Sequence, residues 1–192
     1  VIAHPDIFRL NFITDPYLRH VGVMDGDKRE DIEAAGGMLF LTRDSLELMP
    51  GLITTGEVER VTDFEEVGIA LYTVVGGEVQ SDPMKDDISL VAHVKGKGLV
   101  IITGCSHAGI VNIVKQAIAI TGTEEVHGII GGFHLLEAPL DRIKKTAQAL
   151  KEFGPDWVYA GHCTGFRAQV EFFQMLRDRF SPLHTGMIVE VS

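Results

Sequence analysis

A pattern repeated three times in the second half of the chain constrains the fold more than any other feature. From Gly98 onward, an apolar segment, a glycine-containing turn and an amphipathic helical segment follow one another. Strands that alternate with helices of this length form βα units, so the sequence predicts an α/β layered fold. The predicted strands are 98–103, 127–130 and 157–160, the predicted helices are 111–121, 140–153 and 169–180, and a closing strand is predicted at 187–191.

Each of the three turns contains one histidine. These are His107, His134 and His162, which are separated by 27 and then 28 residues. Because βα units bring the carboxyl ends of parallel strands to one edge of the sheet, we expect the three imidazoles to lie close together there. Neutral imidazole is a preferred ligand of zinc, iron and similar ions, and glycine turns allow a close approach of the backbone. The sequence therefore predicts a metal site at this edge.

The two cysteines of the chain adjoin two of these histidines. Cys105 lies two residues before His107, and Cys163 directly follows His162. As ligands they would have to be thiolates, whereas as neighbours they would be small buried residues. We predict that both are neighbours, with Cys105 supporting the metal site without binding the ion. Two cysteines are too few for a disulfide framework, which favours the reducing cytoplasm.

The first turn also permits a different chemistry. Residues 104–108 nearly match the GxSxG nucleophile elbow, with alanine in place of the final glycine. In this alternative Ser106 attacks an acyl carbon, His162 is the base and Asp156 orients it. Asp156 and His162 lie at opposite ends of one short strand, which rises about 3.3 Å per residue, so the spacing disfavours a triad.

Composition limits the partners. The chain has 17 Lys+Arg against 27 Asp+Glu, a formal net charge of −10, and this excludes a generic nucleic-acid binder. The longest uncharged apolar run, near 98–102, is far shorter than the roughly 20 residues that cross a bilayer, and no basic-then-apolar leader opens the chain. We therefore expect a small-molecule substrate, with neither a nucleic acid nor a membrane as partner.

Domain organisation follows from the same composition. Apolar residues make up 45% of the chain and charged residues 23%, which suits one globular core. Residues 1–192 are expected to form one domain. Within it, residues 1–85 show weak periodicity, and residues 86–192 carry the strand–helix units.

Three segments together resemble a known family. They read TGCSHAGI at 103–110, GGFHL at 131–135 and GHCTG at 161–165. These motifs are similar to the metallo-β-lactamase superfamily, and within it to the branch named after 7,8-dihydropterin-6-methyl-4-(β-ribofuranosyl)-aminobenzene 5′-phosphate synthase. The resemblance covers at least residues 86–191. It implies an αββα sandwich that holds one or two divalent metals, which activate water or polarise an ester or phosphoryl oxygen.

The resemblance also implies roles for single residues. His162 matches the last metal-binding histidine of the family, and His107 matches the ligand in the GCSH turn. His134 resembles a branch-specific position, which we assign to catalysis. Phe133 and Thr164, which stand beside these histidines, are expected to bind substrate. The expected cofactor is a divalent metal, with zinc first and iron or manganese as alternatives.

The chain departs from the family pattern in two places. Many relatives end the first of these strands in Thr-Gly-Asp, with the aspartate bridging two metals, whereas here Cys105 takes that place, and this leaves the bridging group open. The family motif HxHxDH is absent, because the chain contains no His-x-His pair. The resemblance therefore implies the C-terminal portion of such a domain, incomplete at the N-terminus. It also implies reduced metal affinity and an exposed sheet that favours homo-oligomers.

The leading functional prediction is a metal-dependent hydrolase of metallo-β-lactamase type that acts on a small phosphate- or pterin-bearing molecule. One alternative is a transferase that condenses a dihydropterin with a ribosylaminobenzene phosphate. A second is a truncated binding module without catalytic activity. The third is a serine hydrolase that uses Ser106.

Overall fold

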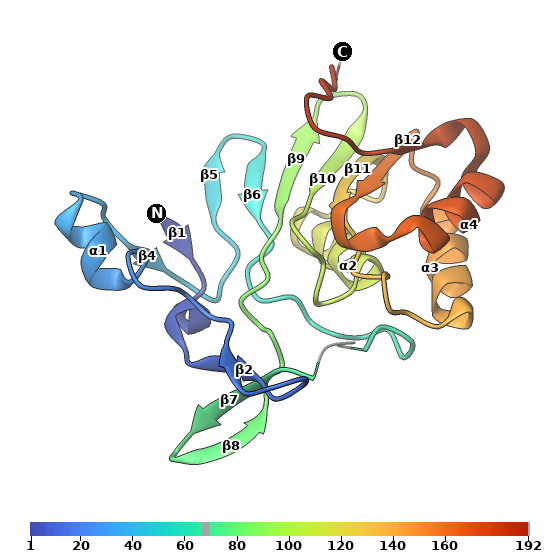
Figure 1. Cartoon of the computed structure of the whole chain (residues 1–192). Helices are drawn as coiled ribbons and strands as arrows, with labels where there is room; N and C mark the ends of the chain where they lie inside the picture. Colours follow the sequence, from blue (N-terminus) through green and yellow to red (C-terminus); the bar gives the residue numbers. More distant parts are fainter. Residues whose placement is uncertain (67–69, 192) are drawn as a thin grey trace.

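A seven-stranded mixed sheet forms the framework of the chain (Figure 1). The computed structural model describes residues 1–66 and 70–191. Strands β10 to β13 run parallel to one another, and β9 pairs antiparallel with β10. In spatial order the strands are β13 (Phe180–Pro182), β12 (Trp157–Gly161), β11 (Val126–Gly132), β10 (Gly98–Ile102), β9 (Leu90–Val94), β6 (Leu52–Thr54) and β5 (Glu47–Met49).

Three helices connect the parallel strands in chain order. They are α2 (Ile110–Thr121), α3 (Leu140–Phe153) and α4 (Phe166–Leu176). Because each step moves to the next strand in the same direction, right-handed crossovers place all three helices on one face of the sheet. The main core lies between these two layers and includes fully buried Leu99, Ile101 and Ile129 from the strands and Ile113 and Leu150 from the helices. The predicted α/β fold is confirmed.

The opposite face of the sheet carries apolar side chains that are only partly buried. Ile102 is 42% exposed, and the rings of Trp157 and Tyr159 stack with centroids 4.8 Å apart. Gly128 lies beneath the Trp157 ring, where an added Cβ would come within 2.0 Å of a ring atom. Within residues 1–66 and 70–191, no helix layer covers this face. The described residues thus form one sheet and one helix layer of the expected sandwich.

The first part of the chain forms smaller elements, which lie to one side of the main sheet in Figure 1. Arg9 joins them to the segment before β9, because its guanidinium donates to Asp82 and Asp86, each at 2.7 Å. Among the described residues, no helix combines the length and the apolar character that a membrane span requires. The elements are a parallel pair of β1 (Ile2–Ala3) and β4 (Phe40–Leu41), a sheet of β2 (Asn11–Ile13), β3 (Arg19–His20), β7 (Tyr72–Val75) and β8 (Glu78–Ser81), helix α1 (Arg29–Ala34), and a 3-10 turn at Pro5–Phe8. Two further 3-10 turns, His162–Thr164 and Arg177–Arg179, follow β12 and α4.

The third strand–helix unit ends differently from the prediction. Helix α4 ends at Leu176, because Arg177 adopts a left-handed conformation with φ of 57°. Phe180, predicted as the end of the helix, instead begins β13 and pairs with Val158. The closing strand predicted at 187–191 is wrong: β13 is the strand beside β12, residues 187–191 pair with no described strand, and Ile188 is 84% exposed.

The N-terminus of α2 is capped by a segment distant in sequence. The carboxylate of Glu65 accepts hydrogen bonds from the backbone N–H groups of Val111, at 3.0 Å, and Asn112, at 2.8 Å. The Asn112 side chain in turn accepts from the backbone N–H groups of Val61 and Thr62. These bonds satisfy donors that a helix start leaves free, and they fix the segment around Glu65 to the helix.

The Glu65 contacts predict a pH dependence of stability. Burial raises the pKa of the Glu65 carboxyl above its ordinary value, and the two N–H donors offset this in part. As the pH rises past the unfolded-state pKa, the unfolded chain releases a proton that the folded chain retains, so this group makes stability fall. We therefore expect the free energy of unfolding of wild type to fall relative to that of Glu65→Gln as the pH rises from about 4 to 7. Urea unfolding of both proteins across this range measures the difference, and parallel pH profiles would contradict it.

Candidate metal centre

Turns after three parallel strands meet at the carboxyl edge of the sheet. The turn after β10 carries Cys105 and His107, the turn after β11 carries His134, and the turn after β12 carries His162 and Cys163. Each turn holds one non-glycine residue at positive φ, with values of 60° at Ser106, 48° at His134 and 51° at His162. Such conformations persist only where the surroundings hold them, and they cluster at functional sites.

Two thiols and one imidazole form a potential ligand cluster at this edge. The Sγ of Cys105 lies 3.2 Å from the Nε2 of His162, and these atoms and the Sγ of Cys163 all lie within 4.8 Å of one another. Donor atoms around a tetrahedral zinc ion lie about 3.3–3.8 Å apart. A small inward movement of these three side chains would therefore place their donor atoms at three of the four tetrahedral positions. Gly132 keeps the space open, because an added Cβ there would lie 2.7 Å from Cys163 Sγ. The donor set fits a soft divalent cation such as zinc.

The Cys105 thiol is protonated when no cation is bound. Burial raises the pKa of the Cys105 thiol to about 12, and the neighbouring Cys163 and Asp87 act in the same direction. A coordinating cation deprotonates a thiol outright, so binding would release protons. The cluster therefore becomes a thiolate site only together with its ion.

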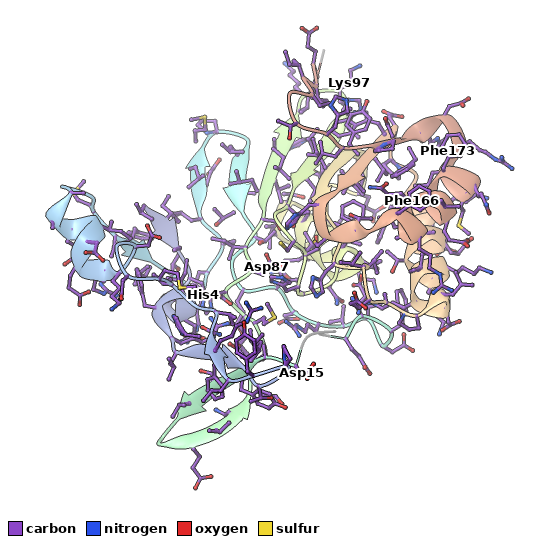
Figure 2. All side chains as sticks on the ribbon, viewed as in Figure 1. His4, Asp15, Asp87, Lys97, Phe166 and Phe173 are labelled. Carbon is purple, nitrogen blue, oxygen red and sulfur yellow. The ribbon has the colours of Figure 1, made fainter. Side chains whose placement is uncertain are left out.

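His107 and His134 form a second group beside the cluster. Their rings pack edge to face, with centroids 4.7 Å apart. Burial lowers the pKa of His134 to about 4, with His107 and Arg142 contributing, and burial also lowers the pKa of His107. Both rings are therefore neutral at pH 7. Asp87, just before β9, accepts the backbone N–H of His107 (Figure 2).

The structure groups the candidate ligands differently from the sequence prediction. His162 lies with the two thiols, whereas His107, predicted as the second metal ligand, contacts His134 instead. Cys105, predicted to support the site without binding, supplies a donor atom to the cluster, and Cys163 was not predicted as a ligand. The signal for both was their position within two residues of a turn histidine.

Comparisons with known proteins agree with this architecture. No family model matches the chain. It is 42% identical, over 99% of its length, to the 7,8-dihydropterin-6-methyl-4-(β-D-ribofuranosyl)-aminobenzene-5′-phosphate synthase of Methanocaldococcus jannaschii, and it covers 65% of that protein. It is 28% identical over its whole length to an uncharacterized protein of the same organism, of which it covers 68%.

A solved structure extends the match to the fold. The crystal structure of Tm1679, described as a metal-dependent hydrolase of the beta-lactamase superfamily, superposes on the whole chain with a TM-score of 0.85 and 26% identity. The chain has the metallo-β-lactamase fold. It spans 71% of that solved chain and 65% and 68% of the two Methanocaldococcus jannaschii proteins, so all three are longer than the sequence described.

The two residues predicted to bind substrate take structural positions in this metallo-β-lactamase fold. Phe133 has no exposed surface, and its ring packs against Phe172 with centroids 5.9 Å apart. Thr164 is also fully buried, and its hydroxyl accepts the backbone N–H of Phe133 at 3.1 Å. This corrects the prediction, because neither side chain presents a surface to a ligand. Phe166, in contrast, is 79% exposed at the start of α4 (Figure 2).

The geometry excludes the serine-hydrolase alternative. Ser106 is fully buried, and its hydroxyl donates to the carbonyl of Gly132 at 2.6 Å. Asp156 lies at the other end of the sheet, where its carboxylate contacts His127 Nδ1 at 2.7 Å. Ser106 therefore joins two turns, and its hydroxyl is not free to attack a substrate.

This role of Ser106 gives a stability prediction. We expect Ser106→Ala to destabilise the chain by about 1–3 kcal/mol, because a buried carbonyl loses its donor. Ser81→Ala, at an exposed position of β8, should stay within about 0.5 kcal/mol of wild type. Urea unfolding measures both. Labelling of wild-type Ser106 by a fluorophosphonate would contradict the structural role.

Proposed function

We propose that this chain is part of a metal-dependent enzyme that condenses a dihydropterin with a ribosylaminobenzene phosphate. The observation that carries the proposal is the cluster of Cys105, His162 and Cys163 at the carboxyl edge of the sheet. The choice of substrates is supported by the 42% identity to a synthase whose product name contains both parts. The choice of zinc is supported by the two sulfur donors, with iron and manganese as alternatives.

The site residues have distinct tasks in this proposal. Cys105, His162 and Cys163 would hold the cation, which when bound would polarise an ester or phosphoryl oxygen. His134 and Cys163 line a cavity of about 530 Å³, which is large enough for a small organic substrate. The imidazole of His134 is neutral at pH 7, so when Nδ1–H donates to a ligand its other nitrogen, Nε2, can accept a proton as a general base does.

The condensation follows from the name of the product. A bond forms between the amino nitrogen of the aminobenzene and the 6-methyl carbon of the dihydropterin. The bond from that carbon to a leaving group, such as diphosphate, breaks, and the amine proton passes to a base. Hydrolysis of a phosphate ester is the second candidate, and the solved metal-dependent hydrolase of the same fold supports it.

Product analysis of the zinc-loaded chain tests the proposal. We expect mass spectrometry to find the condensed product when both substrates are present, and EDTA to abolish its formation. Release of inorganic phosphate without condensation would instead support the hydrolase. A chain that binds zinc but yields neither product would overturn the proposal and favour a binding module without catalytic activity.

A further inference from the structure

Two residues that line one cavity each hold a buried polar atom without a hydrogen-bond partner. They are Arg142, with Nε, and His134, with Nδ1. Arg142 comes from the first turn of α3 and is 8% exposed, and His134 comes from the turn after β11. Three other side chains in the described part of the chain hold such an atom, and none of them lines this cavity. Buried donors of this kind normally have partners, so the pair indicates an absent ligand.

The guanidinium of Arg142 is a buried charge without a carboxylate partner. Its Nη1 donates to the backbone carbonyl of Glu66 at 2.7 Å, and within residues 1–66 and 70–191 no carboxylate lies at ion-pair distance from it. Burial lowers the pKa of Arg142, and the charges of Glu65 and Glu66 act in the opposite direction. Buried charges in proteins are usually paired, and an anionic ligand would supply the missing partner.

The helix that carries Arg142 also favours an anion. Pro139 stands at the N-cap of α3 and offers no side-chain cap to the first N–H groups. The helix dipole adds positive potential at this end. Asp141, the acidic residue of the first turn, forms an ion pair with Lys145, with 2.8 Å between its Oδ2 and the Lys145 Nζ, so its charge is partly neutralised.

The carboxylates around the cavity lie at its rim. Asp63, Glu66, Glu137 and Asp141 line the cavity, and all four are exposed. Water and salt screen exposed charges more than buried ones, so these carboxylates repel a bound anion less than buried carboxylates would. The apolar side chains of Phe64 and Leu136 line the same cavity and would contact an organic group.

We propose that Arg142 and His134 bind an oxyanion, a phosphate monoester or a carboxylate, at one end of the substrate. The Arg142 Nε–H and the His134 Nδ1–H would donate to its oxygens. This inference rests on the proposed function, because Cys163 lines the same cavity and the reacting end of the molecule would therefore reach the metal cluster. It assigns the cavity to recognition of the anionic end, apart from the residues that hold the cation.

Binding of phenyl phosphate and of benzoate tests the inference and separates the two anions. Each is titrated by calorimetry into the metal-free and the zinc-loaded chain. In parallel, the Arg142 Nε–H resonance is followed by ¹H–¹⁵N NMR. We expect at least one of the two compounds to bind the metal-free chain, to shift this resonance and to slow its exchange with water.

Substitutions locate the effect. Arg142→Met should weaken binding by about 10- to 100-fold, because a charge-assisted hydrogen bond is lost. Arg142→Lys keeps the charge but loses Nε–H and should give a smaller loss. Lys144→Met, which removes an exposed charge of the same helix outside this cavity, should change affinity by less than about threefold.

The outcomes separate this inference from the proposed function. Absence of binding by both compounds, equal affinity of Arg142→Met and wild type, or an unshifted Nε–H resonance at saturation would overturn the inference. If the Arg142 variants do not fold, the wild-type resonance decides alone. Zinc binding with no anion binding would overturn this inference but not the proposed function. Anion binding without zinc binding would overturn the metal-dependent reaction but not this inference.

Discussion

Replacing His162 by alanine is expected to lower the zinc affinity of the chain by about 100-fold or more. His162 supplies the single nitrogen of the cluster, 3.2 Å from Cys105 Sγ, and its loss leaves two donors where catalytic zinc takes three. Competition with a chromophoric chelator measures the affinity. In the cobalt-substituted chain, Cys163→Ser should also weaken the sulfur-to-metal charge-transfer absorption.

Two histidine variants make this prediction specific. His93 is exposed on β9, away from the turns, and His93→Ala should leave zinc affinity unchanged. His107→Ala should lower it by less than about tenfold, because His107 contacts His134 and does not belong to the ligand cluster. If His107→Ala weakened zinc binding as much as His162→Ala, the ion would lie between these histidines and the thiol cluster would be the wrong site.

Replacing Phe133 by alanine is expected to destabilise the chain by about 3–5 kcal/mol. The ring is fully buried against Phe172, so its removal loses apolar burial and leaves a cavity. Phe166→Ala is the matched control, because this phenylalanine also adjoins a turn but is 79% exposed, and its loss should stay within about 0.5 kcal/mol. Urea unfolding measures both. A Phe133→Ala chain of normal stability but weakened ligand binding would restore the substrate-binding role.

The sequence predicted the strand–helix units well, because their apolar periodicity is strong and glycines mark their ends. The predicted helix 140–153 coincides with α3, which ends at Gly154 in a left-handed conformation. The last unit was mispredicted because nothing in the sequence marks Arg177 as a left-handed residue that ends α4. The alternation at 187–191 suggested a strand, but Phe180–Pro182 takes the place beside β12, and residues 187–191 pair with no described strand.

The site was predicted in position but not in detail. Turn histidines after parallel strands had to meet at one edge, and they do. Which way each side chain points depends on backbone angles, and each of these turns contains a residue at positive φ, Ser106, His134 or His162, which the sequence does not mark. The sequence did not predict Arg142 as a site residue, because it belongs to a run of charged residues in a helix, and such residues normally lie in solvent.

The bonds between Asn112 and the segment around Glu65 reach further than the start of α2. The same segment supplies Asp63, Phe64 and Glu66 to the wall of the cavity beside His134. A random-mutagenesis screen that selects variants with low turnover would therefore find Asn112 variants as well as variants of site residues, although the Asn112 side chain is buried away from the cavity. In Asn112 variants the Michaelis constant should rise while the zinc stoichiometry stays at the wild-type level. Variants of the metal ligands should instead bind less zinc.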